Sequence, residues 1–317
     1  MPVELTEDLL LDVGDAIGIA EHSLVEKDFH VTQILAGLSN FQSDFFFLIF
    51  AGGTCLSKTV AELERMSEDI DLKLVPTEAG LKLSGNARRS ALRGVKIGIS
   101  AIIESCGYQY KIIKQENNNQ HIEWEVYCEN ITTQTDALRP NIQVETTYCE
   151  QFDEYIDFQF GSLVAYITGS ELEVESMPCV SATYTAAEKL VAILRRTAGI
   201  NRGLPWDDDR LIRHVYDIHV LVVHEVIDYE AIIEIIEGVI EWDGSRFSNK
   251  HPEFQDDPLA ECDSSLIALS DNPIHAENYA NFLNPLVYST TAEQDFQVAL
   301  SSVSNLYQYF CKHQTAF

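Results

Sequence analysis

The stretch from Phe45 to Val75 constrains the fold most, because it joins an apolar run, a double glycine and a D-x-D pair. The run FFFLIF (45–50) is short, apolar and followed by glycines, which predicts a buried strand. Gly52 and Gly53 then open a short helix, and the segment DIDLKLV (69–75) alternates as a strand does. The sequence therefore predicts a strand, a glycine turn, a helix and a second strand in direct succession.

The two carboxylates of the D-x-D pair, Asp69 and Asp71, point to the same side of the predicted strand. They repel each other, so a cation should lie between them, and Mg²⁺ is bound by a few carboxylates together with substrate phosphates. The double glycine upstream offers backbone N–H groups to a phosphate at the start of a helix. The alternative is an exposed edge strand whose acids are merely solvated. The combination favours a site for a nucleoside triphosphate and Mg²⁺.

A two-metal site usually needs a third carboxylate from another strand. Glu145 in NIQVETTY (141–148) is the preferred candidate, because it follows apolar residues of an alternating strand. Glu123 and Glu125 in HIEWEV are the competing choices, and an outward-facing Glu145 without any metal is the plainer alternative.

The rest of the chain predicts an α+β fold with a mixed sheet, flanking helices and a mostly helical C-terminal domain. We predict two N-terminal helices, the second over 23–38, and a long helix over 79–105. Further strands are expected at 108–114, 121–130, 141–148 and 172–180, and nearly continuous helix from Ala186, with a long loop over 244–265. A boundary near residue 183 divides a domain of residues 1–183 from a helical domain of residues 184–317.

Charge is distributed unevenly. The net charge of −29 argues against nucleic-acid binding, since phosphates are contacted by Lys and Arg. Residues 82–114, however, contain seven basic side chains and one acid, Glu104. Arg89, Arg93 and Lys96 share one face of the predicted helix. This face is either a track for tRNA or a counter-charge for the acidic helical half.

Cysteine usage and hydropathy indicate a cytoplasmic protein. The seven cysteines are scattered and form no C-x-x-C pair, which is typical of reduced thiols. No apolar run reaches the length of about 18 residues that a membrane span needs, and the acidic N-terminus does not look like a signal peptide.

Four motifs, in order, resemble the AbiEii/AbiGii family of nucleotidyltransferase toxins, within the polymerase-β-like nucleotidyltransferase superfamily. The first along the chain is VEKDFHVTQIL (25–35) in an N-terminal helix, and the second is GGTCLSK followed by RMSEDIDL (52–72). The third is AEKLVAILRR (187–196), and the fourth is RHVYDIHVL (213–221). The last third of the chain carries no such motif.

The resemblance implies a role for each matching residue. Asp69 and Asp71 would bind metal, and Lys189 and Asp217 would belong to the active site. Together with Glu145, which its strand makes the preferred third acid, they form the expected catalytic and metal-binding set. The expected nucleotide-binding residues are Gly52, Gly53, Thr54, Lys58, Arg65, Ser67 and Arg196.

Several of these residues have a structural alternative. Lys189 would contact the triphosphate, or would be a surface lysine. Asp217 lies among apolar residues, so it would be either an active-site acid or the buried partner of a nearby cation. Arg65 would be a phosphate ligand or an ion-pair partner.

Three other polar features of the sequence can also be interpreted: a charged triplet, two histidines and an acidic insertion. We expect the triplet Glu26-Lys27-Asp28 to form a solvated face or a brace for the fold, and His214 and His219 to serve in packing or hydrogen bonding. The acidic insertion 197–210 would cover the cleft.

The expected activity is transfer of a nucleoside monophosphate from an NTP to an acceptor such as tRNA, by the toxin of a toxin–antitoxin or phage-defence system with a cognate antitoxin. A protein hydroxyl as acceptor suits the negative charge better. An inactive nucleotide-binding relative is the remaining alternative.

Overall fold

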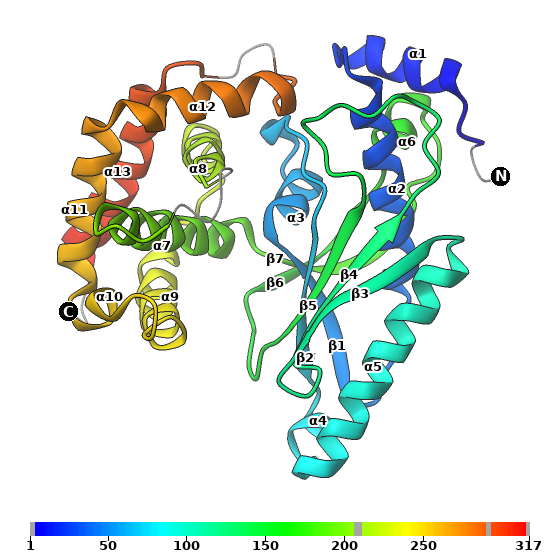
Figure 1. Cartoon of the computed structure of the whole chain (residues 1–317), viewed down its shortest axis with the longest axis horizontal. Helices are drawn as coiled ribbons and strands as arrows, with labels where there is room; N and C mark the ends of the chain where they lie inside the picture. Colours follow the sequence, from blue (N-terminus) through cyan, green and yellow to red (C-terminus); the bar gives the residue numbers. More distant parts are fainter. Residues whose placement is uncertain (1–3, 206–210, 290–292, 315–317) are drawn as a thin grey trace. The chain divides into compact units, whose positions relative to one another are not determined.

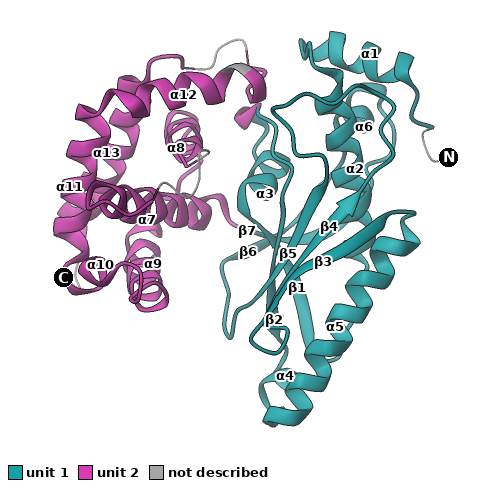
Figure 2. Ribbon diagram, in the orientation of Figure 1, with its two compact units in different colours: residues 1–61, 65–180 teal, residues 62–64, 181–317 magenta. Residues whose placement is uncertain are grey.

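A computed structural model describes residues 4–205, 211–289 and 293–314 (Figure 1). The chain forms two compact units (Figure 2). The first contains residues 1–61 and 65–180, and the second contains residues 62–64 and 181–317. Among the described residues, no helix is long and apolar enough to cross a membrane.

The first unit is built on a seven-stranded mixed sheet of order β3-β4-β5-β2-β1-β7-β6. The β2–β5 and β1–β7 pairs are parallel, and the other pairs are antiparallel. The strands are β1 (Phe46–Ala51), β2 (Ile70–Pro76), β3 (Gln109–Glu116), β4 (His121–Tyr127), β5 (Ile142–Tyr148), β6 (Tyr155–Phe160) and β7 (Val174–Val180). The predicted α+β class with a mixed sheet is confirmed.

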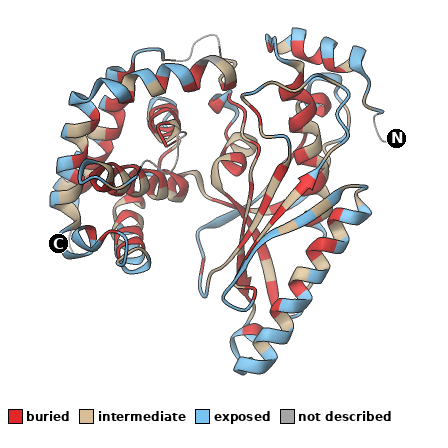
Figure 3. Ribbon diagram, in the orientation of Figure 1, coloured by how far each residue is buried: buried red, intermediate tan, exposed pale blue. Residues whose placement is uncertain are grey.

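The described part of the first unit contains six helices, which are α1 (Glu7–Ile17), α2 (His22–Ser39), α3 (Gly52–Thr59), α4 (Glu78–Leu81), α5 (Gly85–Ser105) and α6 (Leu163–Thr168). Helices α2 and α5 pack against one face of the seven-stranded sheet, and the other face carries polar side chains. Apolar residues of α2 and α5 share a core with Ile70, Leu72, Trp124 and Val144. The strand residues between these point the opposite way, and they include Asp71 and Glu145, which are half-buried. Figure 3 shows the buried and half-buried stretches of the sheet strands. Strand alternation therefore separates the core from a polar sheet face.

The second unit is helical apart from the short 3₁₀ turn η1 (Ala61–Leu63), whose residues 62 and 63 belong to it. Its central helix α7 packs against α8, α9 and α11, and α13 packs against α8. The helices are α7 (Ala182–Asn201), α8 (Arg213–Val223), α9 (Ile232–Arg246), α10 (Pro252–Asp256), α11 (Pro258–Asp271), α12 (Pro273–Leu286) and α13 (Phe296–His313).

Two predictions of secondary structure are wrong. The expected loop over 244–265 is mostly helical, because Pro252 and Pro258 each begin a helix at its first turn, where the missing N–H costs nothing. The expected single helix over 79–105 is divided into α4 and α5, because Ser84 adopts an extended backbone before Gly85. Strand β6 and helix α6 were not predicted.

Trp124 tests the apolar side of the sheet. It is completely buried and donates from Nε1 to Ser100 Oγ at 3.0 Å. Trp124→Ala should lower the free energy of unfolding by about 3–5 kcal/mol, measured by urea denaturation. Tyr127→Ala, which removes a half-exposed ring of the same strand, should change it by less than about 1 kcal/mol. Equal losses in the two variants would contradict this assignment of the core face.

Candidate active site

The double glycine gives room to three side chains of the following segment. Gly52 has φ +77°, and a Cβ at this position would lie 2.0 Å from Oδ2 of Asp71. A Cβ on Gly53 would lie 2.9 Å from Nη2 of Arg65 and 3.0 Å from Oγ of Ser67. The carboxylate of Asp71 therefore rests directly against the backbone at the start of α3.

Asp69 and Asp71 lie on the same face of the sheet, as predicted from their spacing, and both are half-buried. Asp69 precedes β2 by one residue, and its Oδ1 accepts a hydrogen bond from Nη1 of Arg139 at 2.8 Å. The same Nη1 donates to Oε1 of Gln143. A positive group is expected near the two aspartates of the D-x-D pair. For Asp69, this group is the guanidinium of Arg139.

Arg139 was missed by the sequence analysis. Because β2 and β5 are parallel neighbours, residues that precede one strand lie near residues that precede the other. Arg139 stands just before β5, as Asp69 stands just before β2. The pairing of these two strands would have identified it, but the sequence does not show which strands pair.

Glu145 lies next to Asp71 across the β2–β5 pair, in direct register. On its other side it faces Glu123 of β4, so three carboxylates occupy one row across neighbouring strands. Glu145 Oε1 accepts from Oγ1 of Thr147 at 3.0 Å. Glu125 faces Gln143, one row away from Asp71. Of the three candidate acids, Glu145 is therefore the one in register with Asp71.

The row formed by Asp71, Glu145 and Glu123 ends beside a cationic side chain, Lys114. Lys114 Nζ donates to Oε1 of Glu123 at 3.0 Å, and Nε2 of His121 lies 2.8 Å from the same oxygen. Burial acts to raise the pKa of Glu123, but the hydrogen bonds from Lys114 and His121 outweigh it and lower that pKa. The hydrogen bond to Glu123 raises the pKa of Lys114. Within the described residues, His121, Glu123 and Glu145 each place one potential metal-ligand atom within 4.8 Å of the others.

Polar side chains around the double glycine form hydrogen bonds with neighbouring residues. Thr54 is buried, and its Oγ1 donates to Oγ of Ser67 at 3.0 Å. Arg65 is also buried, and its Nη1 donates to the carbonyl oxygen of Met66 at 3.0 Å. The segment 65–69 is therefore held beneath α3.

The triplet Glu26-Lys27-Asp28 is buried. Of its two expected roles, a structural brace for the fold is therefore observed, and a solvated face is not. Glu26 accepts from the backbone N–H groups of Ile131 and Thr132. Lys27 Nζ donates to the carbonyl oxygens of residues 139 and 141, at 2.7 and 3.1 Å. Residues 131–141, which include Arg139, are thereby bound to α2.

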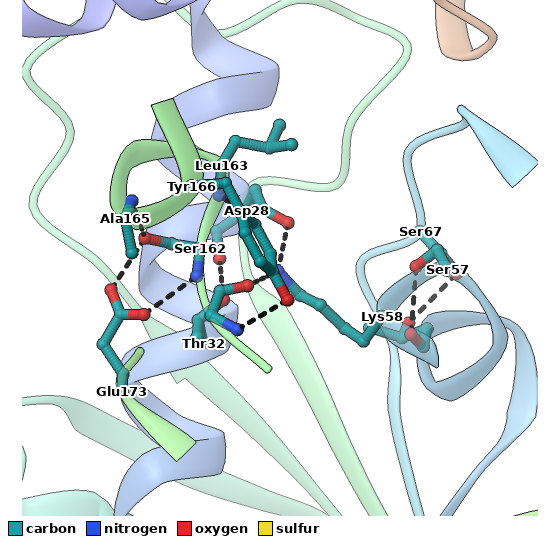
Figure 4. A network of polar contacts seen from close by, with 12 residues as sticks. Asp28, Thr32, Ser57, Lys58, Ser67, Ser162, Leu163, Ala165, Tyr166 and Glu173 are labelled. Atoms are coloured by element: carbon teal, nitrogen blue, oxygen red, sulfur yellow. Dashed lines mark hydrogen bonds and ion pairs between the residues drawn. The ribbon is translucent and has the colours of Figure 1, made fainter. Parts of the chain in front are cut away.

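The third residue of the triplet binds a residue of the glycine motif. Lys58 Nζ lies 2.5 Å from Oδ1 of Asp28 and donates to the carbonyl oxygen of Gly161 at 3.1 Å. Asp28 Oδ2 accepts from the N–H of Leu163 at 2.7 Å. Figure 4 shows Asp28 between Lys58 and Leu163. In this arrangement Lys58 joins α3 to α2 and α6, and its expected contact with nucleotide stays a prediction.

The remaining expected residues lie in the helical unit. Lys189 of α7 and Asp217 of α8 form an ion pair of 2.8 Å, and both are buried. His214 Nδ1 lies 3.5 Å from Nζ of Lys189. Burial lowers the pKa of His214 well below 6.5, and the positive charges of Lys189, Arg213 and Arg196 lower it further, against Asp217. Lys189 is therefore not a surface lysine, and Asp217 has the cationic partner that its burial requires.

Two other expectations concern the helical unit. His219 Nδ1 hydrogen-bonds Oγ of Ser302 at 2.9 Å, as expected for a packing residue. Of the insertion 197–210, residues 197–201 continue α7, and Arg202 pairs with Glu253 at 3.2 Å and with Glu261. Residues 206–210 lie outside the described residues, so the proposed cover of the cleft stays a prediction.

Comparisons with known proteins concern the family and the fold of the chain. The family model described as nucleotidyl transferase AbiEii toxin, type IV toxin–antitoxin system, matches residues 33–302. MenT4, a nucleotidyltransferase toxin from Mycobacterium tuberculosis H37Rv, superposes with a TM-score of 0.57 at 15% identity, covering 99% of this chain and 91% of that one. At this identity the superposition is evidence for a shared fold alone.

A protein from H. pylori assigned as a nucleotidyltransferase gives a TM-score of 0.41 at 12% identity, covering 97% of each chain, and we draw nothing from it. No curated protein sequence matches.

A substitution at Gly52 tests whether the carboxylate of Asp71 lies against the backbone of this glycine. Gly52→Ala should lower the free energy of unfolding by about 1–2 kcal/mol from the positive φ and by about 1–3 kcal/mol more from displacement of Asp71. Gly18→Ala is the matched control, because Gly18 has φ +75° and a Cβ added there would meet no atom within 4 Å. Chemical denaturation should show the larger loss at Gly52. Equal losses would mean that Asp71 does not lie against this glycine.

His214 tests the charge environment of the helical unit. Because its folded-state pKa is lowered, it favours folding above the unfolded value of 6.5, and this contribution is lost as pH falls below 6.5. The unfolding free energy of the wild type should fall between pH 7 and 5, and His214→Asn should reduce that slope by up to about 1.4 kcal/mol per pH unit. His313→Asn controls for loss of an exposed histidine. Parallel pH profiles of the wild type and His214→Asn would contradict the assignment.

Proposed function

This chain belongs to the AbiEii family of nucleotidyltransferase toxins of type IV toxin–antitoxin systems, and we propose that it transfers a nucleoside monophosphate from an NTP to tRNA with Mg²⁺ as cofactor. The single observation that carries this proposal is the gathering of Asp71 against Gly52 with Glu145 in register beside it. It joins a glycine turn suited to a triphosphate and carboxylates suited to a divalent cation.

The donor set fits Mg²⁺. Asp69, Asp71 and Glu145 offer hard carboxylate oxygens on one face of the sheet, and all three are half-buried and reachable from solvent. In this proposal these three residues hold the metal, which supplies positive charge to the triphosphate. Asp69 would exchange its hydrogen bond with Arg139 for the metal, and Arg139 would then be available to a phosphate oxygen.

The triphosphate would lie at the start of α3. Gly52 and Gly53 begin α3, whose first N–H groups favour an anion, and Thr54, Ser67 and Arg65 lie around them. Lys58, Lys189, Arg196 and Asp217 keep the roles that the family resemblance implies. The Lys189–Asp217 pair would fix the lysine ammonium in one orientation.

The chemistry is an in-line displacement at the α-phosphorus of the NTP. A hydroxyl oxygen of the acceptor forms the new P–O bond and loses its proton to solvent, while the bond between the α- and β-phosphates breaks and pyrophosphate leaves. Positioning and charge neutralisation supply most of the rate enhancement in reactions of this kind.

The basic side chains of the first unit support a nucleic acid as the acceptor. Lys82, Arg89 and Arg93 are exposed on or next to α4 and α5, and Lys111 and Lys114 lie on β3. A polyanion such as tRNA would use this surface, because the chain as a whole is acidic. The net charge of −29 supports a second candidate acceptor, a protein hydroxyl. The reaction would take place in the cytoplasm, where NTPs and tRNA are found, and the toxin would have a cognate antitoxin.

The test is to incubate the protein with each labelled NTP, Mg²⁺ and either total RNA or a lysate. Label in tRNA is expected. Asp69→Asn and Asp71→Asn should lower the rate at least about 10²-fold, since each loses a charge that neutralises the reacting phosphates through its metal. Asp44→Asn, at an exposed aspartate, should keep the wild-type rate.

Three outcomes separate the alternatives. Label in protein alone would replace tRNA by a protein hydroxyl. Absence of label with every NTP would leave an inactive nucleotide-binding relative. Full activity of Asp71→Asn would show that the site is assigned to the wrong residues.

A further inference from the structure

A second potential cation site lies on the polar face of the sheet, at the end of the row Asp71–Glu145–Glu123 that is farther from Asp71. It is formed by His121 and Glu123 of β4 and Glu145 of β5, which together offer one nitrogen and two oxygen ligands. We propose that His121, Glu123 and Glu145 bind a first-row transition-metal ion such as Co²⁺ or Zn²⁺. The site shares Glu145 with the proposed Mg²⁺ ligands, but its occupation does not require the transferase activity.

The imidazole of His121 lies between the two carboxylates. Its Nε2 is 2.8 Å from Oε1 of Glu123, and its Nδ1 is 3.4 Å from Oε1 of Glu145. In a tetrahedral site with metal–ligand distances of about 2.0–2.2 Å, neighbouring ligand atoms are about 3.2–3.6 Å apart. The two separations involve different ring nitrogens, but one ligand atom from each residue lies within 4.8 Å of the other two. Side-chain rotations that move these atoms by about 1 Å would bring three ligands around one ion.

The nitrogen ligand selects the kind of metal. Mg²⁺ is bound by oxygen ligands, whereas imidazole together with carboxylates suits Zn²⁺ and other first-row transition ions. When one ring nitrogen of His121 binds the metal, the other remains near an acceptor, either Glu123 or the pair Glu145 and Thr147. Metal-bound histidines commonly donate their second N–H to such a partner.

The charges also call for a cation. Glu123 and Glu145 face each other directly across the β4–β5 pair, and like charges in that position are destabilising. Lys114 Nζ now lies 3.0 Å from Glu123, but its side chain is 42% exposed and can turn away into solvent. The ammonium of Lys114 thus occupies part of the place that a metal ion would take.

The backbone beneath these ligands is rigid. Ile122, Trp124 and Val144, which alternate with them along the two strands, are buried in the core. Metal binding therefore needs no rearrangement of the strands, and the ligands are presented before the ion arrives.

The test is titration of the intact, chelator-treated protein with Co²⁺, followed by visible absorption and by isothermal titration calorimetry, without nucleotide. One saturable site is expected, with ligand-field bands of a nitrogen- and oxygen-bound ion and no thiolate charge-transfer band. His121→Asn and Glu123→Gln should weaken binding at least about tenfold, which is the loss that even an outer partner of a metal ligand causes. His224→Asn, at an exposed histidine of the helical unit, should bind as the wild type does.

Lys114→Gln makes the test independent of folding defects, because it predicts a gain. Removing the competing ammonium should tighten Co²⁺ binding several-fold. The proposal is overturned if His121→Asn binds as tightly as the wild type, if a thiolate band appears, or if no saturable binding is found. Since the readout needs no NTP, its failure would leave the transferase proposal standing, and an inactive enzyme would leave this one standing.

Discussion

The carboxylate of Asp71 rests against the bare backbone of Gly52, and the polar face of the sheet is organised around that contact. Antiparallel pairing of β1 with β2 sets Ala51 opposite Asp71, and parallel pairing of β2 with β5 sets Asp71 opposite Glu145. Three strands thus bring a helix start and two carboxylates together. A side chain at position 52 would occupy the space of the carboxylate, so glycine is required there for packing as well as for its positive φ. The glycine turn is therefore part of the acidic site whether or not a phosphate binds to it.

Buried charges determine where Arg139 lies. Removing a charge from water is costly unless several hydrogen bonds replace the lost hydration, and each residue of the Glu26-Lys27-Asp28 triplet makes such bonds. Two of them bind the backbone of residues 131–141, more than a hundred positions away along the chain. Because these bonds require particular backbone positions, they fix the segment that carries Arg139 to its place beside Asp69. A helix of the core thereby controls the charge next to the first aspartate of the D-x-D pair.

The sequence predicted the features that depend on the periodicity of apolar residues along one strand or helix. It did not predict the features that depend on which strands pair with each other. Alternation identified β2, β4 and β5 and the common face of Asp69 and Asp71, and the glycines identified the start of α3. Arg139 and His121 were missed because their importance follows from the neighbours of β5, which no local pattern encodes. The expected loop over 244–265 is wrong because Pro252 and Pro258 stand at the first turn of a helix, a position that the sequence alone did not distinguish from a loop. The burial of Lys27 was unforeseen because α2 is covered on nearly all sides, so its charged residues could not be assigned to a solvent face.

The ion pair of Lys189 and Asp217 satisfies both buried charges, but it does not explain why charged residues occupy these positions. Replacing a buried ion pair by apolar side chains of similar volume is often neutral or stabilising, so stability gives little reason for a lysine and an aspartate at these positions. The ammonium of Lys189 lies 3.5 Å from Nδ1 of His214. Burial and the charge of Lys189 hold the pKa of that imidazole well below 6.5, so His214 is neutral at pH 7 and does not compete with Lys189 for Asp217. Asp217 therefore holds the lysine ammonium in one orientation, which is what a fixed positive charge for the proposed polyphosphate ligand requires.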